Sequence, residues 1–147
     1  MTNPAKVKGT TFERDIKNKL NKHLKNGSFS RVAGSGAIGT VAHEPLLTGD
    51  LNGKIKGFSR KFKGECKVGY GGATQLTLKK EWLDKVIEQA EQAYSIPIFF
   101  GKFSGARKSD GVQEFIVLDF DTFVYMMNIV SDLQTELDIV YEKLQKG

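Results

Sequence analysis

Three residues whose side chains are suited to hydrolytic chemistry lie near the middle of the chain. Asp50 follows a glycine, and Glu65 and Lys67 flank the single cysteine, Cys66, in the stretch GECKVG. Residues 60–68 alternate between apolar and charged side chains, which is typical of a strand. Side chains two positions apart on a strand project from one face, about 7 Å apart. We therefore expect Glu65 and Lys67 to share a site and Cys66 to point into the core.

Asp50 opens the preceding predicted strand, residues 50–58, and would meet Glu65 if the two strands pair. Two carboxylates beside a lysine offer oxygen ligands to a hard divalent cation and leave positions for water and a phosphate. Lys67 would then neutralise charge on the phosphate or orient the attacking water. The alternative is structural, with Asp50 as an ordinary turn residue and Glu65 and Lys67 as a surface ion pair.

Helical periodicity and apolar runs of strand length alternate along the chain. Residues 10–26 predict a helix, because Phe12, Ile16, Leu20 and Leu24 recur every four residues. Thr10 is a natural N-cap for it. A second helix is predicted at 78–94, and strands are predicted around 28–34, 50–58, 60–68, 96–103 and 113–120. This order predicts an α/β domain whose central sheet is packed by helices.

Composition and length limit the classes of protein that the chain can represent. With 147 residues, 39% of them hydrophobic and 27% charged, the chain fits one globular domain. No apolar run is long enough to cross a bilayer, and no signal-peptide core is visible, so we expect a soluble, intracellular protein without a membrane partner. One cysteine cannot form an intrachain disulfide, and with two histidines it cannot supply a zinc cage.

Charge is distributed unevenly. The net charge is +5, yet residues 119–147 hold six acidic and two basic side chains, so the first 118 residues carry +9. Residues 54–67 hold six basic side chains against one acidic one. A positive field favours a polyanion such as DNA, read through its backbone and shape, although lysine-rich surfaces also serve solubility alone. The basic residues predicted to contact DNA are Lys6, Lys8, Arg31, Lys54, Lys56, Arg60, Lys61 and Lys63. Ser35, in the glycine-rich loop, is a further candidate for DNA contact, with the satisfaction of loop backbone groups as the equal alternative.

The acidic end of the chain predicts a long helix over residues 121–147, following a main domain over residues 1–120. Its apolar positions alternate steps of four and three through about three heptads: Met126, Val130, Leu133, Leu137, Val140 and Leu144. Such a seam is typical of a coiled coil that pairs two chains. The alternative is a helix that packs on its own domain.

The motifs together resemble the PD-(D/E)XK nuclease superfamily. Asp50, a gap of 14 residues and then Glu65-Cys66-Lys67 correspond to the superfamily signature. KGTTFERDI, residues 8–16, is similar to the first helix of Holliday junction resolvases of the archaeal type and their phage relatives, and RVAGSGA, residues 31–37, is similar to their glycine-serine loop. Trp82 stands where that family has a glutamine.

The resemblance covers about residues 8–120 and implies a restriction-endonuclease-like mixed sheet flanked by helices. It further implies a metal-dependent endonuclease that cuts branched double-stranded DNA, as in recombination and repair, and that works as a homodimer. The cytoplasm of a prokaryote or of a phage-infected cell is the location that the resemblance implies. In such a family Asp50 and Glu65 bind the metal with the carbonyl of Cys66, Lys67 is catalytic, and Glu13 completes the site. We expect Mg²⁺ as the cofactor, with Mn²⁺ as a substitute.

Three alternatives stay open at this point. Thr10-x-x-Glu13 could be a simple capping box. The enzyme could be a nickase or restriction-like nuclease of the same fold. It could also be a DNA-binding protein without activity.

Overall fold

The structure is a computed structural model, and it describes residues 4–32, 50–69, 74–105 and 111–147. The chain divides into two compact units, Met1–Val117 and Leu118–Gly147, which are described separately below. In the part of the chain that the structure describes, no helix is both long and apolar enough to cross a membrane.

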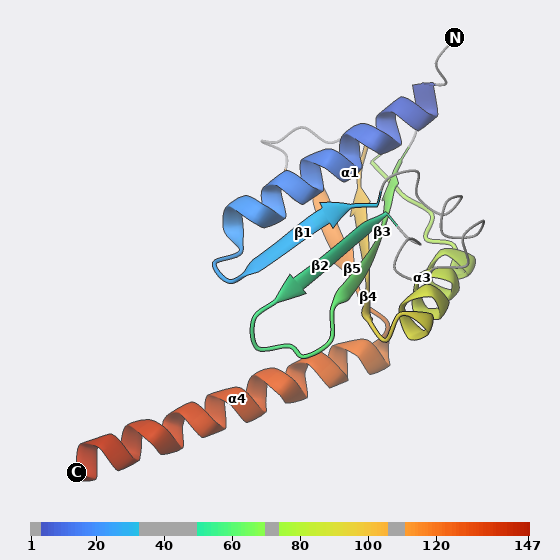
Figure 1. The fold of residues 1–147 in the computed structure, drawn as a ribbon. Coiled ribbons are helices and arrows are strands. Elements are labelled where there is room, and N and C mark those ends of the chain that lie inside the picture. The colour runs from blue at the N-terminus through green and yellow to red at the C-terminus, as the bar shows by residue number, and fades with distance from the viewer. Residues whose placement is uncertain (1–3, 33–49, 70–73, 106–110) are drawn as a thin grey trace. The chain divides into compact units, whose positions relative to one another are not determined.

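The first unit is built on one five-stranded mixed sheet (Figure 1). Its strands lie in the order β1-β2-β3-β4-β5, with β3 parallel to β4 and the other neighbours antiparallel. Helix α3 connects the two parallel strands, as a βαβ crossover requires. In chain order the elements are α1 (Pro4–His23), β1 (Gly27–Arg31), β2 (Leu51–Ile55), β3 (Phe62–Val68), α3 (Lys80–Gln92), β4 (Ile96–Lys102) and β5 (Glu114–Val117).

The expected α/β class and the central mixed sheet are confirmed, but the start of the first helix is not. Helix α1 begins at Pro4 and ends at His23, whereas the apolar spacing predicted residues 10–26. Proline suits a first helical position because its missing N–H would have no partner there. Thr10 therefore lies inside the helix, and the capping box with Glu13 is wrong.

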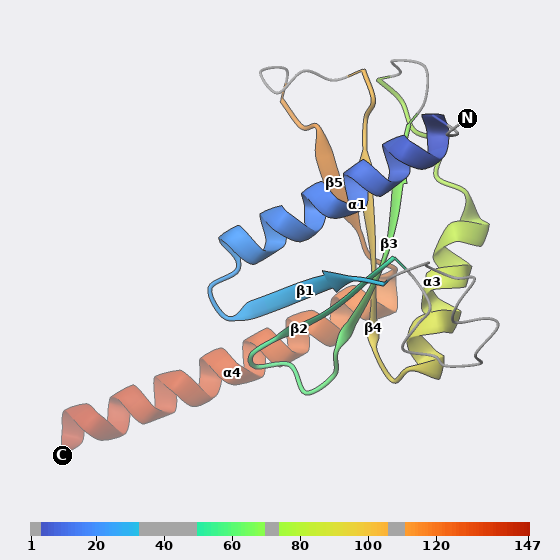
Figure 2. The same ribbon diagram turned by 45° about the horizontal axis from the view of Figure 1, so that its top comes forward.

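The register of the sheet separates its two faces. Phe29, Phe62 and Phe100 lie on the face covered by α1, whose Ile16 and Leu20 line one hollow together with Phe100. Phe99 lies on the opposite face, where Trp82 of α3 stacks on it with ring centroids 6.1 Å apart. Figure 2 shows the strands between the two helices. Both faces of the sheet are thus buried, which explains why most of β3 is buried along its length.

Two glycines permit the close packing of the aromatic side chains on the α1 face. A Cβ at Gly53 would lie 2.3 Å from the Phe29 ring, and one at Gly64 would lie 2.8 Å from the Phe100 ring. Gly64, the glycine of GECK, is therefore the position at which the Phe100 ring lies directly against the backbone of β3. Any side chain there would displace that ring or the strand.

The second unit consists mainly of one long helix, α4 (Phe120–Lys146). Asp119 caps it, since its carboxylate accepts hydrogen bonds from the Thr122 N–H at 3.2 Å and the Thr122 hydroxyl at 2.5 Å. The long C-terminal helix predicted from the sequence is confirmed.

Candidate active site

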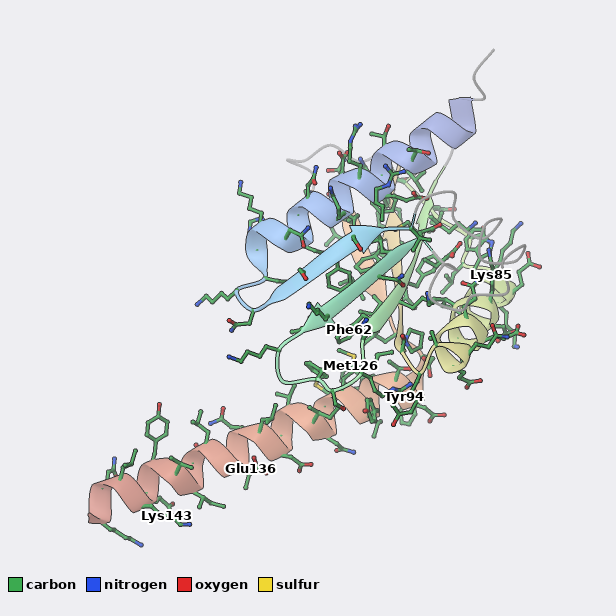
Figure 3. All side chains as sticks on the ribbon, in the orientation of Figure 1. Phe62, Lys85, Tyr94, Met126, Glu136 and Lys143 are labelled. Atoms are coloured by element: carbon green, nitrogen blue, oxygen red, sulfur yellow. The ribbon has the colours of Figure 1, made fainter. Side chains whose placement is uncertain are left out.

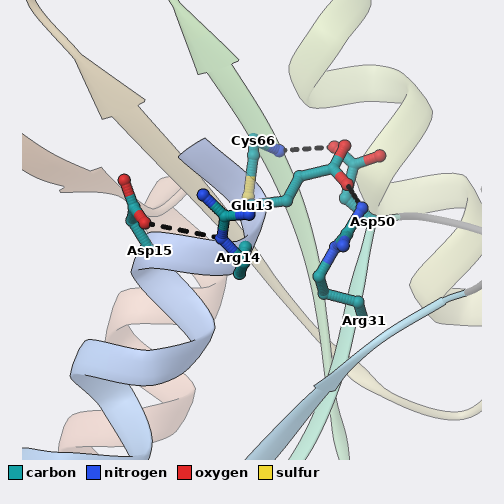
Figure 4. Close-up of polar contacts among 6 residues, drawn as sticks. All are labelled: Glu13, Arg14, Asp15, Arg31, Asp50 and Cys66. Atoms are coloured by element: carbon teal, nitrogen blue, oxygen red, sulfur yellow. Dashed lines mark hydrogen bonds and ion pairs between the residues drawn. The ribbon is translucent and has the colours of Figure 1, made fainter. Parts of the chain in front are cut away.

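Asp50 is held at the end of the sheet by three hydrogen bonds. Its N–H donates to the Gly64 carbonyl at 2.9 Å, and its carbonyl accepts from the Val32 N–H at 3.0 Å. Its side chain extends the pairing with β3, because Oδ2 accepts from the Cys66 N–H at 2.7 Å (Figure 4). The carboxylate is therefore fixed in direction, and it is buried, with only 9% exposed.

Glu65 and Lys67 project from the α3 face of β3 and form the pair expected from their spacing. Lys67 Nζ lies 3.7 Å from Glu65 Oε1, and Lys85 Nζ of α3 lies 3.9 Å from the same oxygen. Glu65 is buried, whereas Lys67 and Lys85 are partly exposed. The surface ion pair considered as an alternative does not describe this arrangement, because the acid is in the interior. One carboxylate oxygen is thus shared by two ammonium groups at the edge of the interior.

The second oxygen of Glu65 lacks such support from the residues that the structure describes. Glu65 Oε2 is buried and has no hydrogen-bond partner among them. Burial and the nearby charge of Asp50 raise the pKa of Glu65 to about 7, against the opposing effect of Lys85 and Lys67. The two acids that the sequence analysis placed together therefore do interact.

Glu13 reaches the same place from α1 (Figure 4). Its Oε2 lies 3.3 Å from Arg31 Nη2, which ties α1 to the end of β1. Burial raises the pKa of Glu13, and so do the charge of Asp50 and a hydrogen bond with Asp50, while Arg31 lowers it. Three carboxyl groups, from α1, from the residue before β2 and from β3, consequently gather at one end of the sheet, although they are far apart in the sequence.

The Cys66 thiol and the Cys66 backbone lie in different surroundings. The thiol is buried, as expected, and burial raises its pKa well above the ordinary value, so it stays protonated. The N–H and C=O of one strand residue point toward the same neighbouring strand. Because the Cys66 N–H donates to Asp50, the Cys66 carbonyl also points toward the β2 side of β3. Cys66 lies past the point where β2 begins, since the first residue of β2, Leu51, pairs with Gly64.

These oxygens fit a hard divalent cation. Within the described residues no three His, Cys, Asp or Glu side chains already converge as a metal-binding group. However, the buried Oε2 of Glu65 lacks a partner among these residues, and the like-charged carboxyl of Asp50 acts on Glu65. A cation held by Asp50, Glu65 and the Cys66 carbonyl, with Glu13 beside them, would relieve both. Oxygen ligands of this kind suit Mg²⁺ or Mn²⁺ better than zinc.

Two features of α3 near the acids were missed by the sequence analysis. Lys85 contacts Glu65, but the helix that carries it was predicted only from its apolar residues. The spacing of Lys85 in the sequence did not predict this contact. Trp82 packs on Phe99, and the ammonium groups of Lys67 and Lys79 lie 5.2 and 5.5 Å from its ring centroid. The cation–π contact of Lys67 helps to hold this lysine beside Glu65.

The residues predicted to contact DNA are scattered over the fold. Lys54 and Lys56 are exposed and line an open hollow of about 420 Å³ at the far end of β2 from Asp50. Lys61 is exposed four residues before Glu65, or about 13 Å along the strand. Ser35 lies outside the described residues, as do the side chains of Lys6 and Lys8. The basic stretch that surrounds the acids in the sequence therefore extends away from them in space.

Two of these basic residues have contacts within the protein. Lys63 is fully buried, its Nζ donates to Asn52 Oδ1 at 2.9 Å, and burial lowers its pKa to about 8. The Arg60 guanidinium donates to the Ser95 carbonyl at 2.6 Å and lies 4.7 Å from the Tyr94 ring centroid. The structure gives no support to the DNA contacts predicted for Lys63 and Arg60, which stay predictions.

Comparison with known proteins assigns the family. A search of curated proteins gave no match. Residues 4–145 match a family described as "Phage putative PDDEXK endonuclease". This match confirms the superfamily predicted from Asp50, Glu65 and Lys67, and it does not extend to the Holliday junction resolvase type. Members of the superfamily typically use divalent metal ions. With nearly its whole length matched, the chain belongs to this family of phage endonucleases of the PD-(D/E)XK type.

Proposed function

We propose that the chain is a metal-dependent, structure-specific endonuclease that cleaves phosphodiester bonds in four-way DNA junctions. The single observation that carries the nuclease part is the gathering of Asp50, Glu65 and Lys67, with Glu13, at one end of the sheet. The junction part rests on the similarity of residues 8–16 and 31–37 to the resolvases. A phage enzyme of this kind would act in the cytoplasm of the infected cell.

Each side chain has a separate task in this proposal. Asp50 and Glu65 would hold Mg²⁺ together with the Cys66 carbonyl, and Glu13 would assist as a further ligand or by holding Arg31 in place. Mn²⁺, which accepts the same oxygen ligands, substitutes for Mg²⁺. When bound, the cation supplies positive charge to the phosphate and lowers the pKa of water.

Lys67 lies where it can act on the reacting phosphate. Its side chain is 35% exposed, and it is held near the site by Glu65 Oε1 and the Trp82 ring. From this position Lys67 orients the attacking water or neutralises the charge that develops on the phosphate oxygens during in-line attack. One P–O bond to water forms as the bond to the leaving oxygen breaks. Lys85, which lies near the same carboxylate oxygen, adds a second positive charge beside Glu65.

DNA is held through its backbone in this proposal. Arg31 borders the acids, while Lys54, Lys56 and Lys61 lie further along the β2–β3 hairpin and would meet phosphates at a distance from the cleaved bond. Symmetrical cleavage of a junction requires two active sites, so the working form is a homodimer.

The test compares matched substrates that share one sequence. Wild-type protein with Mg²⁺ or Mn²⁺ is incubated with four-way, flap, single-stranded and linear DNA, and Asp50→Asn serves as the control for contaminating nuclease. The amide oxygen introduced by Asp50→Asn can still accept the Cys66 N–H, so the fold should be kept. We expect paired cuts in the four-way junction, and no cleavage by Asp50→Asn.

The other outcomes assign the other functions. Preferential cutting of linear or flap DNA would identify a nickase or restriction-like enzyme on the same site. Junction binding without cleavage under either metal would identify a DNA-binding protein. Undiminished cleavage by a clean preparation of Asp50→Asn would show that the site has been misplaced.

A further inference from the structure

The apolar seam of α4 is defined by two sets of positions that repeat every seven residues. The first set is Phe123, Val130, Leu137 and Leu144, and the second is Met126, Leu133 and Val140. Except for the half-buried Met126, all of these side chains are at least 45% exposed. A helix about 40 Å long thus carries an apolar stripe along nearly its full length.

The charges of α4 are arranged around this seam. Glu136 and Lys143 are the charged residues next to it, and the other flanking positions hold Thr122, Met127, Ile129, Gln134 and Tyr141. Asp121, Asp132, Asp138, Glu142 and Lys146 all fall on the outer side of the helix. Figure 3 shows side chains projecting along the whole helix, with Met126, Glu136 and Lys143 labelled. All the acidic side chains of α4 except Glu136 therefore lie away from the seam.

This partition narrows the class of partner. The acidic outer side makes DNA and anionic membrane surfaces poor partners for α4. A seam in steps of three and four is the pattern that accepts the knobs of another helix. Because the positions next to the seam carry few charges, two identical copies of α4 can meet without like charges facing one another. A partner helix of different, complementary charge is therefore not needed. The occupant that satisfies these conditions is a second copy of the same helix.

We propose that α4 pairs with α4 of a second copy of this chain, through a short coiled coil formed by the seam. The pairing is independent of the chemistry at Asp50 and Glu65. It would supply the two-chain form that the proposed function needs, but it would hold for a chain of any activity.

The experiment measures the mass of the full-length protein in solution. Sedimentation equilibrium or light scattering is applied to the wild type, to Leu137→Glu and to Leu133→Glu, each over a range of concentrations. Thr135→Glu is the matched control, because it adds the same charge to the outer side of α4 between the two seam positions. Circular dichroism checks that each variant retains its helix and sheet content.

The expected result is a wild-type mass of twice the 16.3 kDa of one chain, retained in Thr135→Glu. Leu133→Glu and Leu137→Glu should each fall to the mass of one chain while staying folded. A wild type that stays at one chain's mass at every concentration overturns the proposal. So does a dimer that persists in both seam variants, since the interface would then lie elsewhere.

Failure here can be told from failure of the proposed function. Asp50→Asn, which should not cleave, is expected to keep the dimer mass. A monomeric wild type that cuts DNA would refute the pairing of α4 and support the nuclease activity. A dimer that depends on the seam but never cuts DNA would support the pairing and refute the nuclease activity.

Discussion

Replacing Glu65 by Gln should make the metal-free protein more stable at alkaline pH, even though it removes a candidate metal ligand. Folding raises the pKa of Glu65 from 4.5 to about 7, because the group is buried and lies near Asp50. Below pH 4.5 both the folded and the unfolded state hold the proton, and Glu65 does not affect the pH dependence of stability. Between the two values only the folded state holds it, so the free energy of unfolding falls as the pH rises.

The size of the effect follows from the same two pKa values. One pKa unit corresponds to about 1.4 kcal/mol, so ionised Glu65 costs the fold about 3 kcal/mol above pH 7. Most of this cost, about 2 to 3 kcal/mol, develops between about pH 5 and about pH 8. Gln has no proton to lose in this range, so the difference in unfolding free energy between Glu65→Gln and the wild type should grow by that amount between the two pH values.

Urea unfolding in the presence of EDTA, at about pH 5 and about pH 8, measures the difference. Glu88→Gln is the matched control, because it makes the same chemical change at an exposed position of α3. Mg²⁺ at the higher pH should stabilise the wild type and have little effect on Glu65→Gln. If the wild type and Glu65→Gln respond to pH in parallel, Glu65 is not a buried acid with a raised pKa, and the argument for a cation beside it fails.

Three further predictions concern neighbouring residues. Asp50→Asn should abolish cleavage while leaving the fold and DNA binding intact, because the amide oxygen can still accept the Cys66 N–H; the readouts are a cleavage assay, circular dichroism and a binding titration. Lys85→Met should slow cleavage about tenfold or more, since it removes a positive charge 3.9 Å from Glu65. The control is Lys80→Met, on the same helix but paired with Asp84, which should leave the cleavage rate unchanged. Equal rates for the two variants would refute a role for Lys85. Arg60→Ala should lower the unfolding free energy by about 1–2 kcal/mol through the lost carbonyl and ring contacts, with unchanged DNA affinity at a concentration where the variant is folded; weaker binding would instead support the DNA contact predicted from sequence.

The sequence was sufficient wherever a property repeats along the chain. The alternation around Glu65 and Lys67 was enough to place both side chains on one face and Cys66 on the other, because the strand period does not depend on what the strand packs against. The spacing of apolar residues was likewise enough to predict α3 and α4. The start of α1 was not predictable in this way, since its first turn lacks the apolar repeat and Thr10 imitates a cap.

Other features depended on contacts between distant segments. Glu13 and Asp50 meet because α1 crosses the sheet beside the start of β2, and Lys85 meets Glu65 because α3 returns along the opposite face. Burial gave Glu65 its raised pKa, and burial also made Lys63 an interior residue within a stretch that looks uniformly basic in the sequence. The sequence alone was therefore enough to identify the candidate residues. Their burial, and with it their pKa values and partners, depended on how the sheet and its helices pack together and exclude water.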